Sequence, residues 1–414
     1  MKERTEIAIV GGGLGGLTLA RVLHVHGIRA VVYEGDASRE ARGQGGMLDI
    51  HDYNGQVALR DAELYEEFRR IVHPGGESMR VLDRHGNVLM EERDDGAGGR
   101  PEVDRGDLRR MLLDSLPDGT VRWGSKVTGV RALGDGRHEI ALGDGETTTA
   151  DLVVGADGAW SRVRGLLTDA LPAYAGVTFF ELDLHDADRR HPEAARVVGE
   201  GMLFALGSGK GFLAHRETDG SLHVYVALRV AEGWAAEAGV WAEGGAAGSG
   251  SPDKKGSGRR DKKGSGRPGL EMGSGRTDEE KSALLEHFGG WAPELRALIA
   301  EADGGLVPRA INVLPVGLRW ERVPGVTLLG DAAHLMSPFA GEGANLAMFD
   351  GGELGKSIAA HPGDVEAALR EYEAALFPRS EQAAAEAAAN LELCFRDDAP
   401  QGLVDQFATY AAAG

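Results

Sequence analysis

Short apolar runs and amphipathic segments alternate at the start of the chain. Residues 7–10 and 30–33 are continuous apolar runs of the length that forms buried strands. Residues 17–23 lie between them and are predicted to form a helix. The pattern therefore predicts a strand, a helix and a second strand, the repeating unit of a parallel sheet.

The alternation becomes finer in the next third of the chain. Residues 79–83 and 87–90 flank Arg84-His85-Gly86 and predict a hairpin, and residues 105–113 predict an amphipathic helix. Residues 121–154 alternate apolar and polar positions around two Gly-Asp-Gly turns. We expect them to form three strands that return to the main sheet.

The last part of the chain combines strands and helices. β-like runs at 177–180 and 222–226 predict a second sheet within residues 175–230. From about residue 365 the chain is expected to be helical, with an alanine-rich stretch at 381–389. This arrangement predicts a long C-terminal helix packed over the second domain.

Residues 248–276 differ from the rest in composition. The heptamer Asp-Lys-Lys-Gly-Ser-Gly-Arg at 253–259 recurs at 261–267, and apolar residues are nearly missing. Such a stretch cannot bury a core. We interpret it as a flexible surface-loop insertion, and the alternative is a basic tether for an acidic partner.

The first strand ends in a glycine-rich turn. Gly11, Gly13 and Gly16 fit G-x-G-x-x-G, and Glu34 ends the second strand about 20 positions later, as the dinucleotide-binding fingerprint requires. Gly11 permits the tight turn, Gly13 lets a pyrophosphate approach the backbone, and Gly16 lets the helix pack closely on the strand. Glu34 is expected to bind ribose hydroxyls. The motif alone does not separate FAD from NAD.

Two further glycine segments follow strand-like runs. Asp157-Gly158 comes after residues 151–156, and Gly330-Asp331 comes after Leu328-Leu329. Each segment is a weak signal by itself. The three in this order indicate an FAD enzyme.

Composition narrows the class of protein. The 414 residues exceed one compact core, so we expect at least two domains. A net charge of −20 argues against non-specific nucleic-acid binding, and the single cysteine, Cys394, excludes an internal disulfide. The sequence shows neither a signal peptide nor a membrane span, so we expect a cytoplasmic protein.

With these motifs in view, the chain resembles the single-component FAD-dependent aromatic hydroxylases, which have the para-hydroxybenzoate hydroxylase fold. Within that group it is most similar to the tetracycline-inactivating monooxygenases. The resemblance spans nearly the whole chain except residues 248–276. Besides the glycine motif and Glu34, it is carried by residues 42–50, 54–56, 105–109, 157–164, 330–334 and 338–345.

The resemblance implies a fold and a division of the chain. It implies an α/β protein in which a Rossmann-like FAD-binding domain holds an inserted β-sheet substrate domain and is followed by a long C-terminal helix. The FAD-binding domain is expected at 1–72, 98–168 and 300–375, the substrate domain at 73–97 and 169–299, and the C-terminal helix at 376–414.

The resemblance also implies roles for particular residues. Asp331 is expected to hold the FAD ribose, residues 338–345 to wrap the isoalloxazine ring, and Arg109 to reach the flavin phosphate or ribitol. Arg42 is expected beside the flavin. The cofactor-binding set is Gly11, Gly13, Leu14, Gly15, Gly16, Glu34, Arg42, Gly45, Gly46, Arg109, Asp157, Gly158, Gly330, Asp331, Pro338, Gly341, Gly343, Ala344 and Asn345.

Simpler roles are open for some of these residues. Arg42 is alternatively a surface ion-pair residue, and Arg109 alternatively pairs with acidic neighbours on its own helix. Asp331 is alternatively only a helix N-cap.

The chain departs from the family at two places. Glu342 stands where many members have glutamine, and a carboxylate there would oppose negative charge on a reduced flavin, so we expect its side chain to point away. Glu181 stands where the tetracycline enzymes carry a glutamine. Their tetracycline-contacting arginine and histidine have no clear counterparts around residues 202–215.

The implied activity is a monooxygenase reaction. NADPH or NADH reduces the flavin, which adds O2 to form a C4a-hydroperoxide that hydroxylates a polycyclic aromatic or polyketide-type molecule, in antibiotic biosynthesis or resistance. Such chemistry needs no metal. We expect no separate nicotinamide-binding domain, so the nicotinamide is expected to bind transiently. We expect a monomer without nucleic-acid or membrane partners.

A base that ionises a substrate phenol would assist the reaction. The candidates are Glu181, His185, His215 and His223. Rival interpretations are a flavin halogenase, whose W-x-W-x-I-P motif is missing, a desaturating or Baeyer–Villiger oxidoreductase, and a non-catalytic flavin-binding sensor.

Overall fold

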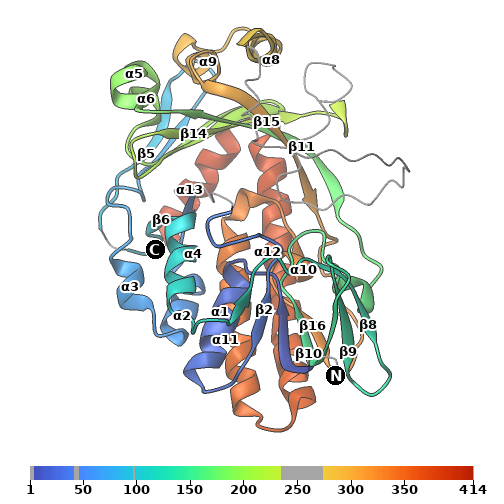
Figure 1. Cartoon of the computed structure of the whole chain (residues 1–414). Coiled ribbons are helices and arrows are strands. Elements are labelled where there is room, and N and C mark those ends of the chain that lie inside the picture. The colour runs from blue at the N-terminus through green and yellow to red at the C-terminus, as the bar shows by residue number, and fades with distance from the viewer. Residues whose placement is uncertain (1–3, 42–45, 97, 235–273, 414) are drawn as a thin grey trace, which may run out of the picture.

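The computed structural model describes residues 4–41, 46–96, 98–234 and 274–413. Two seven-stranded sheets form the body of the molecule. The second sheet lies across one end of the half that contains the first sheet (Figure 1). The repeat-bearing residues 248–276 lie almost entirely outside the described ranges, as do Arg42 and Gly45.

The first sheet is mainly parallel. Its strands run in the order β7 (Val121–Arg122), β2 (Val31–Tyr33), β1 (Arg4–Val10), β10 (Thr147–Gly155), β9 (His138–Leu142) and β8 (Val127–Ala132), and β16 (Val326–Leu328) pairs with β10. The strands β1, β2, β7, β10 and β16 are joined in parallel, and β8, β9 and β10 form an antiparallel meander. The predicted N-terminal unit and the predicted three-stranded excursion are both confirmed.

Helix α1 (Leu14–Val25) packs closely on α11 (Glu342–Ala360) because both carry glycines at the contact. A Cβ on Gly15 would lie 2.5 Å from the carbonyl oxygen of Ala347, and a Cβ on Gly351 would lie 2.5 Å from that of Gly15. This half also contains the shorter helices α2 (Gly55–Asp61), α3 (Tyr65–Arg69), α4 (Arg105–Asp114) and α10 (Asp331–His334). The helix predicted at 105–113 is thus confirmed as α4.

The second sheet has the order β15 (Asp303–Val313), β11 (Ala173–Leu184), β14 (Leu222–Arg229), β13 (Lys210–Arg216), β12 (Met202–Gly207), β4 (Met79–Leu82) and β5 (Val88–Glu92). Its strands pair antiparallel except for β12 and β4. The predicted hairpin at 79–90 is confirmed as β4 and β5. Strands β3 (Met47–Asp49) and β6 (Glu102–Asp104) form a separate two-stranded antiparallel sheet.

The two faces of the second sheet differ in burial. One face buries an apolar cluster that includes Phe180, Val226 and Leu228 against α5 (Ala187–Arg190), α6 (Pro192–Val198), α8 (Ser274–Glu286) and α9 (Pro293–Ala300), which lie beyond the sheet in Figure 1. The other face, with Phe179 and Leu213, packs on Phe339, Leu391 and Phe395. This second face therefore looks toward the glycine segments.

The C-terminal region contains two helices, where the pattern predicts one. Helix α12 (Val365–Cys394) is followed by α13 (Gln401–Ala413). Pro400 interrupts the helical pattern, because a residue before proline is disfavoured in the α conformation. The expected boundary at residues 375 and 376 falls inside α12, which contacts the clusters of both halves through Tyr372 and Leu391. None of the described helices combines the length and apolar character that a bilayer span requires.

Candidate functional site

The three glycine segments meet at one edge of the first sheet. Strands β1, β10 and β16 are parallel neighbours, and Gly155 is in register with both Val10 and Leu328. Gly11, Asp157 and Asp331 therefore follow strand ends on the same side, where α/β sheets bind nucleotides. The contact is direct, because a Cβ on Gly11 would lie 2.3 Å from the carbonyl oxygen of Ala156.

The first segment has the form of a phosphate site. Gly13 precedes α1, no side chain caps this helix end, and its first turn carries no acidic residue. A Cβ on Gly13 would meet nothing within 4 Å, so the space beside it is open to a ligand. Free N–H groups at a helix start attract anions. The residues present therefore fit the pyrophosphate of FAD.

Glu34 and Arg109 both lie against this glycine segment. Oε2 of Glu34 accepts a hydrogen bond from the amide of Gly12 at 2.7 Å, while Nε of Arg109 donates to the Gly12 carbonyl at 3.1 Å. Arg109 is 4% exposed and its Nη2 lies 3.9 Å from Asp36. The Gly12 carbonyl and Asp36 both lie outside α4. Contact of either side chain with the cofactor stays a prediction.

The second and third segments are joined by Arg164. Its guanidinium donates to the carbonyl oxygens of Ala332 at 3.0 Å and Ala159 at 2.6 Å. The carboxylate of Asp157 accepts from the hydroxyl of Ser161 and the amide of Arg162, both at 2.6 Å. Asp157 thus fixes its own turn, and its burial raises the pKa of the carboxyl.

Asp331 is differently placed. It is the first residue of α10, and the N-cap position before it is held by Gly330. Burial raises the pKa of its carboxyl, while the nearby charges of His334, Arg105 and Arg164 oppose this shift. The N-cap is thus Gly330 rather than Asp331, and a half-buried carboxylate at the start of this helix fits a cofactor hydroxyl.

The loop before α11 is tied to β3 by Asn345. Its Oδ1 accepts from the amide of His51 at 3.0 Å, and its Nδ2 donates to the carbonyl oxygens of Asp49 and Gly341 at 2.8 and 3.0 Å. Gly55 allows this contact, since a Cβ there would lie 2.1 Å from the Asn345 Oδ1. Gly341 has a φ of +67°, and Gly343 faces open space. Leu14 is buried, Ala344 packs on the same apolar cluster, and Pro338 begins a short 3-10 turn.

Polar and apolar side chains of the second sheet form two rows on the face that looks toward this loop. Strand register aligns Met202, His215, His223 and Asp183 in one row, and Phe204, Leu213, Tyr225 and Glu181 in the next. A Cβ on Gly46 would lie 3.6 Å from the Tyr225 hydroxyl, and the Phe179 ring contacts Phe339 at a centroid distance of 5.9 Å. The predicted candidates Glu181, His215 and His223 therefore share one sheet face. This face lies beside residues 338–345, the loop predicted to wrap the flavin ring and called the flavin loop below.

The candidate bases differ in their partners. Nδ1 of His223 lies 2.6 Å from Asp183 Oδ1. Burial opposes the imidazolium, but the Asp183 hydrogen bond and charge outweigh it and raise the pKa of His223. Burial lowers the pKa of His215 to about 4, and Glu181 pairs with Arg309 at 2.5 Å. The amide of His185 binds Asp303 beyond the end of β11. His223 is thus the best-oriented base of the four.

Two residues of this region were missed as site residues. Burial raises the pKa of Glu217 to about 7, and no described group hydrogen-bonds its buried Oε1. Arg105 begins α4, its amide donates to the Gly46 carbonyl at 3.1 Å, and its charge acts on both Asp331 and Tyr225. Arg105 was visible in sequence only as part of a motif, and Glu217 carried no sequence signal.

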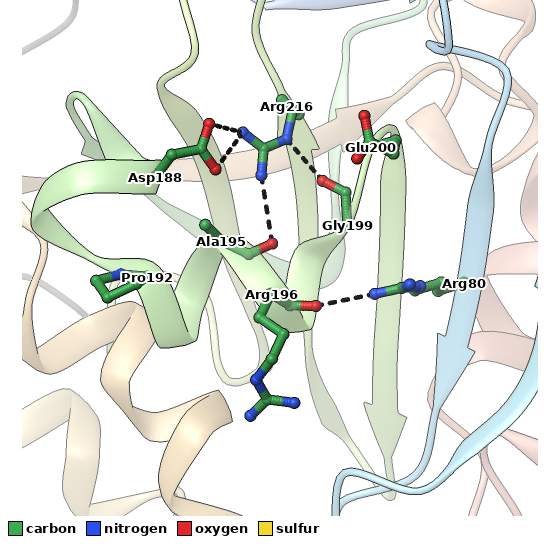
Figure 2. A pocket seen from close by; sticks show the side chains of 8 residues that line it. All are labelled: Arg80, Asp188, Pro192, Ala195, Arg196, Gly199, Glu200 and Arg216. Atoms are coloured by element: carbon green, nitrogen blue, oxygen red, sulfur yellow. Dashed lines mark hydrogen bonds and ion pairs between the residues drawn. The ribbon is translucent and has the colours of Figure 1, made fainter.

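A cavity of about 290 Å³ lies on the other face of the second sheet and is not this site. Figure 2 shows Arg216 directed at Asp188 and at the Gly199 carbonyl, and Arg80 directed at the Arg196 carbonyl. Arg80 also pairs with Glu91 at 2.7 Å. None of the predicted site residues lines this cavity.

Alanine at Gly11 and alanine at Gly13 are expected to act differently. At Gly11 the methyl would meet the Ala156 carbonyl, and the φ of +108° strains any side chain, so G11A lowers the Tm of the FAD-free protein by several degrees. At Gly13 the methyl enters open space, so G13A keeps that Tm but weakens FAD binding at least tenfold. Thermal melting and flavin fluorescence titration check both. Unchanged FAD affinity in G13A contradicts the phosphate site.

Comparison with known proteins agrees with this geometry. The family model described as FAD binding domain matches residues 4–200 and 319–387. The chain is 30% identical to monooxygenase penA of Penicillium thymicola over 95% of this chain and 96% of that protein. It is similar in fold to HpxO of Klebsiella pneumoniae complexed with FAD and uric acid (TM-score 0.74, 23% identity, 99% and 93% of the two chains). It is also similar to the tetracycline destructase Tet(51) (TM-score 0.68, 17% identity, 99% and 95%).

Proposed function

The chain belongs to the FAD binding domain family and is an FAD-dependent monooxygenase, and from that premise we propose that it hydroxylates a polycyclic aromatic or polyketide-type small molecule at the expense of NAD(P)H. We place this reaction in antibiotic biosynthesis or resistance. The observation that carries the proposal is the oriented His223–Asp183 pair on the sheet face that looks toward the flavin loop.

The two rows of the sheet suit a flat substrate with a phenol or enol at one side. Phe204, Leu213 and Tyr225 offer an apolar and aromatic surface, and the neighbouring row offers His215, His223 and Asp183. An aromatic ring stacked on the first row would bring its oxygen to the second. The names of relatives support this class, since one solved neighbour is a tetracycline destructase and a curated relative is a 3-amino-4-hydroxybenzoate 2-monooxygenase of Streptomyces platensis.

Bound and reduced FAD would supply the activated oxygen, and the protein would position the substrate and govern its protons. Nδ1 of His223 is held by Asp183 at 2.6 Å, which leaves Nε2 to take the phenol proton. An ionised phenol is richer in electrons at its ring carbons, which favours attack by an electrophilic oxygen. The contacts of Phe339 with Phe179 and Phe395 close one side of this region with apolar surface, which helps to keep water out.

The FAD-loaded protein should be incubated in air with NADPH or NADH and tetracycline, and the products read by mass spectrometry. A product heavier by one oxygen atom is expected if tetracycline belongs to the substrate class. Consumption of the nicotinamide with formation of hydrogen peroxide alone directs the search to other polycyclic phenols. If a set of such phenols neither stimulates nicotinamide oxidation nor gains oxygen, the proposal is wrong.

A further inference from the structure

A partly buried chain of hydrogen bonds lies behind the loop at residues 338–345, and Tyr53 in its middle is 62% exposed. Nε2 of His51 is 2.9 Å from Asp49 Oδ2, and Nδ1 of His51 is 2.8 Å from the Tyr53 hydroxyl. That hydroxyl donates to Glu342 Oε1 at 2.5 Å. His51 is 3% exposed and Glu342 is 9% exposed. The proposed base chemistry uses none of these groups.

The donors and acceptors of this chain determine where its protons lie. An ionised carboxylate only accepts hydrogen bonds, so the Tyr53 hydrogen is given to Glu342. The Tyr53 oxygen must then accept from Nδ1 of His51, while Nε2 donates to Asp49. An imidazole that donates from both nitrogens is protonated. Nδ2 of Asn54 completes the Glu342 site at 2.7 Å.

The pKa directions agree with this assignment. Burial disfavours the His51 imidazolium, but hydrogen bonds and charge from Asp49 and Glu342 outweigh it and raise the pKa of His51 to about 9. The pKa of Glu342 is lowered, against its burial, by His51, Tyr53 and Asn54. Other charges facing the chain are Arg100, Glu102 and His215 around Asp49 and Glu386 near Tyr53.

The protonated histidine is adjacent to the predicted flavin loop. A Cβ on Gly341 would lie 3.1 Å from Asp49 Oδ2 and 3.4 Å from His51 Nε2. Asn345 binds the backbone of His51, Asp49 and Gly341 together. The loop is therefore hydrogen-bonded through Asn345 to the same residues, Asp49 and His51, that carry the charges.

We propose that His51 is a positioning residue that neutralises Glu342 behind the flavin loop and so makes FAD binding and flavin reduction depend on the protonation of His51. The Glu342 carboxylate alone would oppose negative charge on a reduced flavin ring held at this loop. When His51 is protonated, its single positive charge compensates the carboxylates of both Asp49 and Glu342. The inference rests on the proposed placement of the flavin ring at this loop, but not on the proposed substrate.

The test uses the full chain with FAD in wild type, H51Q, E342Q and the double variant. FAD affinity is measured by flavin fluorescence from pH 6 to pH 10, and the flavin reduction potential is measured at pH 7. The protonation of His51 is followed by ¹⁵N NMR of the imidazole, with H51Q identifying the signal. These measurements do not depend on turnover.

In wild type we expect FAD affinity to be constant at neutral pH and to fall near pH 9, together with the NMR titration of His51. H51Q leaves the carboxylates of Asp49 and Glu342 uncompensated, so FAD affinity should fall about tenfold at pH 7. The change in FAD affinity near pH 9 should be lost, and the flavin reduction potential should drop. E342Q moves the His51 titration to lower pH. The double variant regains most of the affinity and potential, because the uncompensated Glu342 charge is gone.

Three results would overturn the inference. One is a neutral His51 at pH 7 in the wild type. Another is a double variant whose losses are the sum of the single ones, as independent packing defects would give. The third is an FAD affinity step that stays at the same pH in E342Q. A destabilised H51Q does not prevent the test, since E342Q retains the hydrogen-bonding shape and the wild-type NMR titration stands alone.

Discussion

Replacement of Asp350 by asparagine is expected to cost about 3 kcal/mol or more of folding stability, because it leaves the buried imidazolium of His334 and the partly buried guanidinium of Arg379 without their counter-charge. Asp350 is fully buried in α11. Its Oδ2 accepts from the Gly330 amide at 3.0 Å and lies 2.6 Å from His334 Nε2, while its Oδ1 accepts from Arg379 at 2.9 Å. The measurement is chemical denaturation at pH 6.

The pH dependence of this stabilisation has a defined sign. Burial disfavours the charged form of both groups, yet the charge and hydrogen bond between them lower the pKa of Asp350 and raise that of His334. The Asp350 part is present above the ordinary carboxyl pKa and is lost as pH falls through the lowered value. The His334 part is present below the ordinary imidazole pKa and is lost as pH rises through the raised value. The full contribution is thus expected from about pH 4 to pH 6.5.

The matched control for D350N is D398N. Asp398 also pairs with an arginine, Arg396, at 2.5 Å, but both side chains are half exposed, so its loss should leave the denaturation midpoint unchanged. D350N should also weaken FAD binding, because Asp350 holds the amide of Gly330 just before Asp331. If D350N unfolds at the same denaturant concentration as wild type, the buried pair has no stabilising role.

The parts of the fold that sequence predicts are those set by local pattern. The run at 7–10, the glycines and Glu34 specify a strand, a turn and a second strand by local chemistry, and the structure confirms these elements. The three glycine segments could be assigned to one edge because parallel neighbours end on the same side. Local pattern also predicted the hairpin at 79–90.

The polar contacts between distant segments could not be predicted in this way. Asp350 of α11 meets His334 of α10 and Arg379 of α12 only after these helices pack together. Glu342 meets His51 across 291 positions of sequence. No periodicity in the sequence marks such pairs, because each charged residue alone resembles one that is exposed to solvent. The expectation that Glu342 is directed away from the flavin loop rested on charge repulsion, and its partners Tyr53 and Asn54 became visible only in the structure.

Replacement of His223 by glutamine is expected to lower kcat about 100-fold or more on a phenolic substrate, the usual contribution of a positioned base. FAD affinity should be unchanged, because His223 lies on the second sheet and pairs with Asp183 rather than with the glycine segments. The measurement is substrate-stimulated NADPH oxidation with product detection. A kcat within threefold of wild type would remove His223 from the mechanism.

The pH profile separates His223 from its neighbour Glu217. A base must be deprotonated, so activity in wild type should rise with pH through the raised pKa of His223. D183N removes the group that raises the pKa of His223 most, so the rise in activity should move to lower pH. Its kcat should also fall, because Nδ1 of His223 loses its fixed orientation.

E217Q has a different expected effect. Without the Glu217 charge, the pH at which activity rises shifts slightly downward and kcat is largely kept. If E217Q abolishes turnover and H223Q does not, the carboxyl with a pKa of about 7 is the base. The histidine would then act only through its contact with Asp183, because a base that takes the substrate proton cannot be removed without loss of turnover.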